Sequence, residues 1–339
     1  MRRSDERGIA LLLTLLVLTL LVALILEFDA EARREYRDAA AFRDNFKATV
    51  LARAAVQAAR GTLQQDALKD KKAGQSFDAL TDLWALPIRD YAIGDGLLTA
   101  QIEDERGKLN LNDLAAVGEP IAKKAKVQRV KRLFELLQIN PDLVDAIVDW
   151  VDKDETPEPA GAESLYYQTL RPSYRAANAP LQTLLELRLI KGMTPDIIAK
   201  LSKLVTVYPA EGESRVNMNT ANPLVLQALD PRITQGIASD IVQGRPFKTI
   251  QELDRVSSFE DIGKELRQRN LYDVKSDLFM ARMVVKVNEV TRNVTVVLQR
   301  DPSTGTSTVN SKDVDEDDPE ESQRESSTGT STVKYYRVL

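Results

Sequence analysis

The chain opens with MRRSDERG (residues 1–8), continues with IALLLTLLVLTLLVALIL (9–26) and then reads EFDAEARREYRD (27–38). The central run has 18 residues and no charge, and only Thr14 and Thr19 interrupt its apolar side chains. As a helix with a rise of 1.5 Å per residue it is about 27 Å long, close to the roughly 30 Å of a bilayer core. The run therefore predicts a single membrane span.

The charges on the two sides of this run differ in sign. Arg2, Arg3 and Arg7 precede it, whereas the first charges after it belong to Glu27 and Asp29. Because basic flanks stay in the cytoplasm, we expect the N-terminus inside the cell and the rest of the chain outside the membrane. A cleaved secretory signal and a plain single-span anchor are the alternatives, and the length of the run and its charged C-terminal flank disfavour cleavage after it.

A long helix is expected to continue beyond the apolar run. No proline occurs before Pro87, and no glycine lies between Gly8 and Gly61. Alanine, arginine, glutamate and glutamine, which favour helix, fill most of the other positions. One helix is therefore predicted for residues 9–62, roughly 80 Å long, with a last third that is amphipathic and packs on a globular domain. Its apolar positions after the run are close to helical spacing: Phe28, Ala32, Ala39, Phe42, Phe46, Val50, Ala54 and Ala58.

The composition excludes several kinds of chemistry. The chain has 339 residues, with 46 Lys+Arg, 51 Asp+Glu, no histidine and no cysteine. A thiol nucleophile, a Ser-His-Asp triad, a His-ligated zinc and a Cys-ligated iron–sulfur cluster are therefore ruled out, so a bound metal needs oxygen ligands. Nine acidic and two basic residues give residues 301–325 a charge of −7, and since the total is −5 the rest sums to about +2. A nearly neutral body does not favour nucleic-acid binding.

The rest of the chain is expected to form an α+β body, in which a large helical region is inserted into a small antiparallel sheet. A short helix is predicted at 77–83. Strands are predicted from their β-branched or alternating patterns at 97–103 and 107–112, which form a hairpin, and at 283–290, 293–299 and 334–339. Helices are predicted between these ends at 122–137, 141–153, 181–187, 194–204, Pro223–Leu229, 234–243 and 249–256.

Acidic side chains crowd a proline-containing segment between two of these helices. Asp152, Asp154, Thr156 and Glu163 have the spacing of ligand positions one, three, five and twelve of an EF-hand, but Pro157 stands where that loop needs glycine. The segment is therefore either a solvated acidic turn or an oxygen-rich calcium loop of another conformation, since crowded carboxylates repel one another without a cation. Six carboxylates lie within fifteen residues: Asp149, Asp152, Asp154, Glu155, Glu158 and Glu163.

The N-terminal pattern resembles that of type IV pilin-like proteins. A short charged leader ends at Gly8, and an apolar run continues into a long amphipathic helix. The resemblance implies that prepilin peptidase cuts after Gly8 and that Ile9 becomes the N-methylated first residue. Most pilin-like proteins have glutamate at the fifth mature position, where it neutralises the N-terminal amine of a neighbour, but this chain has Leu13.

That departure, together with several motifs of the body, resembles the minor pseudopilin K family of type II secretion systems. The motifs are GKLNLN (107–112), DWVDKDETPEPAGAESLYY (149–167), RPSYRAAN (171–178) and VNMNTANPLVL (216–226). The resemblance implies SAM-like helical lobes in a pilin β-domain, and a subunit that is not an enzyme. Such a subunit caps the tip of the pseudopilus, nucleates its assembly for protein export across the outer membrane, and contacts minor pseudopilins I and J.

The resemblance also implies a location and a metal. The subunit would cross the inner membrane once, with a cytoplasmic N-terminus and a periplasmic body, before it joins the tip. It would hold structural calcium in the acidic segment, with Asp149, Asp152, Asp154 and Glu163 as ligands. The domains expected on this basis are a leader (1–8), a stem helix (9–62), a pilin-like β-domain (63–112 and 280–339, with an acidic disordered loop at 301–332), an inserted helical domain with the metal loop (113–215) and a second lobe (216–279).

Two further motifs have alternative interpretations. Residues 216–253 resemble helix-hairpin-helix units, which bind DNA phosphates through hairpin amides, but the hairpin at 230–236 keeps one glycine and contains Pro231, which has no N–H. A membrane-anchored competence protein that binds DNA is therefore the alternative function, while we expect a structural lobe and no nucleic-acid partner. A solvated face or a docking surface for an acidic partner explains the basic cluster of Lys123, Lys124, Lys126, Arg129, Lys131 and Arg132.

Overall fold

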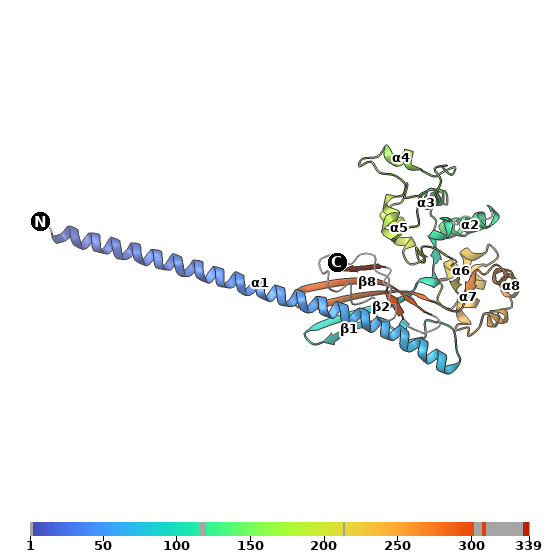
Figure 1. Ribbon diagram of the computed structural model, residues 1–339, viewed down its shortest axis with the longest axis horizontal. Coiled ribbons are helices and arrows are strands. Elements are labelled where there is room, and N and C mark those ends of the chain that lie inside the picture. The colour runs from blue at the N-terminus through green and yellow to red at the C-terminus, as the bar shows by residue number, and fades with distance from the viewer. Residues whose placement is uncertain (1–2, 116–119, 213, 302–306, 310–334, 339) are drawn as a thin grey trace, which may run out of the picture.

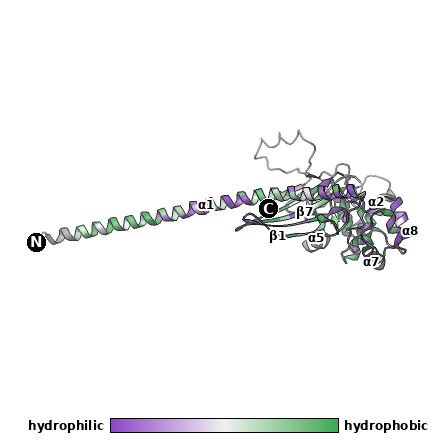
Figure 2. Ribbon diagram, turned by 90° about the horizontal axis from the view of Figure 1, so that it is seen from below, coloured by the Kyte–Doolittle hydropathy of each residue, from purple (hydrophilic) through white to green (hydrophobic). Residues whose placement is uncertain are grey.

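A single long helix projects from a body made of a sheet and several shorter helices (Figure 1). The computed structural model describes all residues except 1–2, 116–119, 213, 302–306, 310–334 and 339. Helix α1 (Arg3–Ala73) has 71 residues, and its apolar N-terminal part extends away from the body, as the colours of Figure 2 show. By length and composition this helix is able to cross a membrane, which agrees with the predicted span.

The C-terminal half of α1 packs against the sheet through a stripe of small side chains. Ala48, Ala52, Ala55 and Ala59 recur at intervals of three or four residues, so they share one face, and all are buried. Alanine lets the helix approach the sheet closely. Leu63, which is completely buried, extends this contact beyond the predicted end of the helix at residue 62. Its burial offsets the cost of about 1 kcal/mol for Gly61 inside the helix.

The sheet is antiparallel and is made from both ends of the body, as predicted. Its order is β1-β2-β7-β8-β10, and β9 also pairs with β8. The three predicted strands near the C-terminus are confirmed as β7, β8 and β10, whereas β1 was not predicted. The acidic loop expected at 301–332 lies almost wholly outside the described residues. The strands are β1 (Ile88–Ile93), β2 (Gly96–Asp104), β7 (Leu278–Val287), β8 (Val290–Arg300), β9 (Ser307–Val309) and β10 (Tyr335–Val338).

Two local predictions are wrong. The expected hairpin does not form, because β3 (Leu109–Asn110) leaves β2 after a turn of 3₁₀ helix and pairs in parallel with β4 (Val205–Thr206). Polar side chains explain the change of direction, since Asn112 is buried and its amide donates to the carbonyl groups of Leu181 and Val207. The helix expected at 77–83 is replaced by a single 3₁₀ turn, η1 (Leu83–Ala85).

The inserted region lies beyond one end of the sheet (Figure 1) and is mainly helical. Five of the seven predicted helices are α-helical, whereas those expected at 181–187 and 249–256 are the 3₁₀ helices η4 (Leu184–Leu189) and η5 (Ile250–Arg255). One hydrophobic core runs through the region, and the predicted division into two lobes stays a prediction. The α-helices and remaining strands are α2 (Pro120–Leu136), α3 (Leu143–Val151), α4 (Ser164–Gln168), α5 (Pro195–Leu201), α6 (Pro223–Leu229), α7 (Gln235–Gln243), α8 (Glu260–Gln268), β5 (Val216–Asn217) and β6 (Tyr272–Asp273).

Candidate metal centre

The acidic segment is a loop that connects the end of α3 to the start of α4. Asp152 is the residue that follows the last turn of α3, and Glu163 directly precedes α4 in an extended conformation. Pro157 and Pro159 lie between them and keep the loop out of helix. The ends of two short helices therefore bring Asp152 and Glu163 to the same place.

Three of the four predicted ligands lie together. Asp152, Asp154 and Glu163 each offer a carboxylate oxygen, and these oxygens are all within 4.8 Å of one another. Asp154 is exposed, but Asp152 is only 8% and Glu163 only 5% exposed. In the part of the chain that the structure describes, Asp152 Oδ1 and both oxygens of Glu163 are buried without a hydrogen-bond partner. Buried oxygens without donors are what a hard cation needs as ligands, because leaving them unpaired is costly.

The pKa values of Asp152 and Glu163 are raised, as expected for buried carboxyls among several crowded acidic side chains. Burial, together with the negative charges of Asp149, Glu155, Asp152 and Asp154, raises the pKa of Glu163 to about 7. Burial also raises the pKa of Asp152. A divalent cation would reverse these shifts, since it favours the charged form of each carboxylate.

Asp149, the fourth predicted ligand, faces the inner side of the loop. It is completely buried, and its carboxylate accepts the backbone N–H of Glu158 at 3.0 Å. Burial raises the pKa of Asp149 to about 6. Gly161 passes so close that an added Cβ would lie 1.9 Å from Asp149 Oδ2. The structure thus places Asp149 under the loop as its support, and its role as a ligand stays a prediction.

Further contacts hold the loop against the rest of the insertion. The N–H of Ala160 donates to Asp145 on α3, and Asp145 pairs with Lys131 at 2.6 Å. Lys191 Nζ donates to the carbonyl oxygens of Ala160 and Gly161, at 3.2 and 2.9 Å. The backbone of the loop is therefore fixed from both sides before any metal binds.

Two residues at this centre were not predicted from the sequence. Asn178 has a positive φ of 44°, and its side-chain amide donates to Asp154 O at 3.0 Å and to Glu155 Oε1 at 3.1 Å. Lys123 Nζ lies 3.2 Å from Asp152 Oδ2 and neutralises part of the acidic group. Both lie far from the loop along the chain, so only the tertiary fold reveals them.

Three of the six residues of the basic cluster on α2 contact other parts of the protein. Lys123 and Lys131 pair with acidic residues of the metal loop region. Arg132 donates to the carbonyl oxygens of Gln227 and Pro231, at 2.7 and 3.1 Å. These three side chains join α2 to its neighbours, so they favour a structural role over a free docking surface.

The hairpin between α6 and α7 shows similar internal pairing. The backbone N–H of Arg232 donates to Asp230 Oδ1 at 2.9 Å, so a carboxylate already occupies an amide of the hairpin. The Arg232 guanidinium pairs with both Asp230 and Glu265. A site whose amide and cation are bound to carboxylates is poorly suited to a DNA phosphate.

Comparisons with known proteins agree with the resemblance seen in the sequence. Family models described as "Type II secretion system (T2SS), protein K" match residues 107–210, which include the candidate metal centre, and residues 216–275. Type II secretion system protein K of Klebsiella pneumoniae is 34% identical over 250 residues, 71% of this chain and 75% of that protein. The corresponding protein of Pseudomonas aeruginosa is 30% identical, over 74% of this chain and 76% of its own length.

A solved structure has the same fold. It is a chain in the crystal structure of the GspK-GspI-GspJ complex from the type 2 secretion system of enterotoxigenic Escherichia coli. The TM-score is 0.64 at 22% sequence identity, and the match covers 77% of this chain and 93% of that one.

Proposed function

Because this chain belongs to the type II secretion system protein K family and is a minor pseudopilin of type II secretion, we propose that it caps the tip of the pseudopilus. There it nucleates assembly for protein export across the outer membrane, together with minor pseudopilins I and J. The solved complex of similar fold contains GspK, GspI and GspJ, which supports this choice of partners. The proposed role is structural and requires no catalysis.

The observation that carries the proposal is the division of α1 into two parts. The sheet buries one side of its C-terminal half, whereas the side chains of the apolar run stay exposed, such as Ile9 at 61% and Leu13 at 57%. An apolar helix surface of this length needs a bilayer or other apolar helices around it. The stem helices of partner pseudopilins provide such surfaces after the subunit leaves the membrane.

Two features, one at each end of the subunit, support the tip position. Leu13 offers no carboxylate to a neighbour's N-terminal amine, so this subunit needs no partner above it at that depth. The helical insertion adds bulk at the far end of the sheet (Figure 1), where a regular filament would place another subunit.

The assembly proposal is tested with the full chain in detergent. Co-expression with minor pseudopilins I and J is expected to yield a complex with one copy of each subunit by native mass spectrometry. Gold labels on this chain are expected at one end of each pseudopilus in electron micrographs. Labels distributed along the filament, or no complex with I and J, would contradict the proposal.

Processing by prepilin peptidase is a separate proposal, supported by the leader that ends at Gly8. The mature protein is expected to begin at N-methylated Ile9 and to remain in the inner membrane, with its body in the periplasm, until assembly. Gly8→Ala is expected to retain the eight-residue leader in mass spectrometry of the purified protein. Gly61→Ala, in the same helix but far from the leader, serves as the control and should be processed normally. A wild-type protein that keeps its leader would refute this step.

We further propose that Asp152, Asp154 and Glu163 bind calcium, with Asp149 behind them and backbone carbonyl groups completing the shell. The buried oxygens of Asp152 and Glu163 that have no donor among the described residues support this assignment. Calcium accepts six to eight oxygen ligands in flexible geometry, which suits a loop without the EF-hand glycine. Its chemistry here is charge neutralisation, which ties α3 to α4.

Thermal unfolding of the full chain in detergent tests the calcium proposal. A chelator is expected to lower the Tm, and calcium to restore it, because a ligand that binds only the folded state stabilises it. The double variant Asp152→Asn, Glu163→Gln should lose most of this response. Asp261→Asn, at an exposed position on α8, is the matched control and should keep it. Identical melts with and without chelator would refute the proposal.

A further inference from the structure

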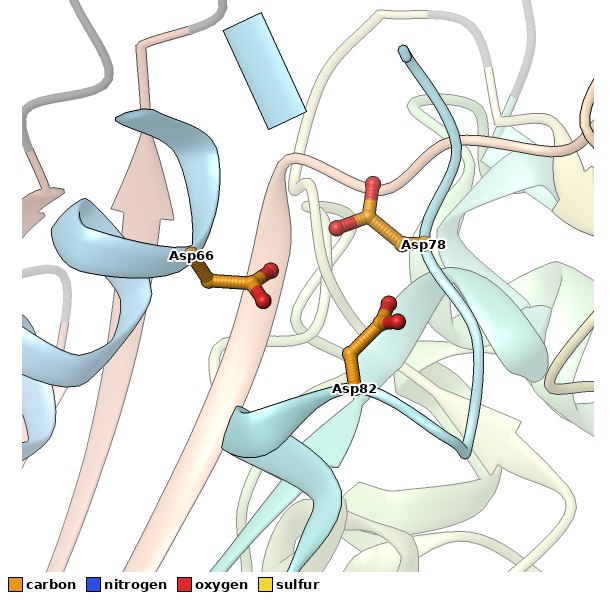
Figure 3. A group of neighbouring side chains, drawn as sticks. All are labelled: Asp66, Asp78 and Asp82. Atoms are coloured by element: carbon orange, nitrogen blue, oxygen red, sulfur yellow. The ribbon is translucent and has the colours of Figure 1, made fainter. Parts of the chain in front are cut away.

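A second group of carboxylates lies where the stem helix meets the body. Asp66 is in the last part of α1, Asp78 is in the segment that follows, and Asp82 directly precedes η1. Each offers an oxygen, and these oxygens are within 4.8 Å of one another. Figure 3 shows that the three carboxylates point toward a shared space between the helix and the following segment.

One of these side chains is buried without a hydrogen-bond donor. Asp66 is 3% exposed, and its Oδ2 has no donor among the described residues. Arg300 Nη1 is the cationic group near it, but it lies 3.6 Å away and makes no hydrogen bond itself. The other end of this guanidinium, Nη2, donates to Asp78 and to the carbonyl oxygen of Ser276. Arg300 is therefore hydrogen-bonded to Asp78, and its ion pair with Asp66 leaves Asp66 Oδ2 without a hydrogen bond.

Donors fix the other two carboxylates, and Asp78 accepts on both oxygens because Arg300 Nη2 donates to its Oδ1. Asp78 Oδ2 accepts the backbone N–H of Ser276 at 2.7 Å, and Asp82 Oδ2 accepts that of Ala79 at 2.7 Å. Each carboxylate oxygen can accept from more than one direction, so these contacts fix the side chains and leave lone pairs for a ligand. Backbone donors thus orient Asp78 and Asp82 toward the same point that Asp66 faces.

The charges in this region do not balance. Three acidic side chains, and Asp70 one turn after Asp66, all interact electrostatically with the guanidinium of Arg300. Burial, together with the negative charges of Asp82, Asp70 and Asp78, raises the pKa of Asp66 to about 7, although Arg300 lowers it. Burial raises the pKa of Asp70 and of Asp82, and Lys69 on the exposed side of α1 offsets only part of this rise.

A cavity lies beside Asp66, one of the three carboxylates. It has a volume of about 440 Å³ and is bordered by Lys69 and Lys72 of α1 and by Leu83 of η1. Water molecules can therefore complete the coordination of an ion that is held by a few protein oxygens.

We propose that Asp66, Asp78 and Asp82 form a second cation site, distinct from the loop at 149–163, which binds a hard divalent cation. The ion fills the position that Asp66 Oδ2 faces, and it links the end of the stem helix to the segment that leads into the sheet. Because Asp78 also holds Arg300 at the end of β8, the site joins three separate parts of the chain. It would fix the direction in which the stem leaves the body.

The two tryptophans of the chain allow the two sites to be observed separately. Trp84 follows Asp82 by two residues. Burial raises the pKa of that carboxyl, and the nearby indole offsets part of the rise. Trp150 follows Asp149 directly at the other centre. Terbium, which replaces calcium at oxygen sites, emits when a nearby excited tryptophan transfers energy to it. Emission from Trp150→Phe therefore reports the Asp66 site, and emission from Trp84→Phe reports the loop.

Tb³⁺ is titrated into the full chain in detergent, with excitation selective for tryptophan. Trp150→Phe is expected to show saturable emission that excess Ca²⁺ or Mg²⁺ abolishes. In the Trp150→Phe background, either Asp66→Asn or Asp82→Asn should raise the apparent Kd for Tb³⁺ by about tenfold or more, since each removes a charged ligand. Asp261→Asn is the control and should leave the titration unchanged. The far-ultraviolet circular dichroism of each variant shows that it is folded.

Several results would overturn the proposal. One is the absence of sensitised emission from Trp150→Phe. A second is unchanged emission in the folded Asp66→Asn and Asp82→Asn variants. A third is emission that neither Ca²⁺ nor Mg²⁺ removes, because the site would then bind only trivalent ions. Emission from Trp84→Phe tests the loop independently, so the failure of one site does not affect the conclusion about the other.

Discussion

Replacing Asp104 by asparagine is expected to remove part of the pH dependence of folding stability. Asp104 ends β2 and is 6% exposed, and its Oδ2 accepts hydrogen bonds from Asn217 Nδ2 (3.0 Å), Thr220 Oγ1 (2.5 Å) and Ser276 Oγ (2.5 Å). Its Oδ1 accepts the backbone N–H of Arg106 at 2.7 Å. This single carboxyl group joins the sheet to the helical insertion.

The direction and size of the effect follow from the pKa of this group. Burial raises the pKa of Asp104 from 3.8 to about 6, although the hydrogen bonds lower it. The folded state therefore binds the proton more tightly than the unfolded chain, so the free energy of unfolding falls as the pH rises from about 4 to about 6. Two pKa units at ~1.4 kcal/mol each correspond to a loss of ~3 kcal/mol. The stabilising contribution of Asp104 is therefore fully present below about pH 4 and is lost above about pH 6.

Trp84 provides a local signal for this measurement. Asp104 lies opposite Phe279 in the β2–β7 ladder, and the Phe279 ring packs edge-on to Trp84 with centroids 5.0 Å apart. Urea unfolding is followed by fluorescence in Trp150→Phe, so that only Trp84 contributes, with and without Asp104→Asn.

The informative quantity is the difference in slope against pH between these two proteins. Other buried carboxyls also titrate in this range, and subtracting the two curves removes their contribution. The protein with Asp104 is expected to lose ~3 kcal/mol more than the variant between about pH 4 and about pH 6.5. Equal slopes would refute the argument. The other carboxyls with a raised pKa include Asp66, Asp149, Asp152 and Glu163.

Two further substitutions have clear expected outcomes. Gly161→Ala should displace the metal loop, because the new Cβ would lie 1.9 Å from Asp149 Oδ2, and calcium should then no longer raise the Tm. Gly236→Ala is the control, because its Cβ would lie at an ordinary contact distance of 3.7 Å from Thr234 Oγ1. Leu63→Ala should destabilise the body by about 2–5 kcal/mol in urea unfolding, since Leu63 is fully buried between α1 and the sheet. Leu68→Ala, at a position 43% exposed on the same helix, should change stability by under about 0.5 kcal/mol. A calcium response in Gly161→Ala, or similar losses for both leucines, would contradict these assignments.

The parts of the fold that were predicted correctly depend on local patterns. The apolar run and the absence of proline and glycine indicate α1, and β-branched residues indicate β7 and β8. The end of α1 at Ala73 was missed because Gly61 and the polar residues after it suggest a break, whereas tertiary burial of Leu63 and Asp66 extends the helix.

The same distinction applies to the two carboxylate groups. Asp152, Asp154 and Glu163 lie within one loop, so their spacing alone indicates a site. Asp66 and Asp78 come together only because α1 ends and the chain turns back toward it, and no short motif contains both. Sequence patterns reveal ligands that one loop supplies, and they miss ligands that separate elements bring together.

Buried asparagines explain both why the predicted hairpin does not form and how the helical insertion is held together. LNLN at 109–112 and VNMN at 216–219 each alternate apolar residues with asparagine, which is typical of a half-exposed strand. In the structure all four asparagines are buried, and in each motif the first side chain accepts the backbone N–H of the second. Each motif also forms a short parallel pair with a distant segment, β3 with β4 and β5 with β6.

The side-chain amides explain why these segments join distant parts of the chain. Asn112 is bound to Leu181 through both its oxygen and its nitrogen, and Asn219 is bound to Phe247 in the same way. A buried amide that makes only one of these bonds is costly, so each motif is stable only when its distant partner is in place. The two halves of the insertion thus use the same device, in which a buried asparagine closes a loop of the chain. This need for partners, rather than strand propensity, determines where residues 107–112 go after β2.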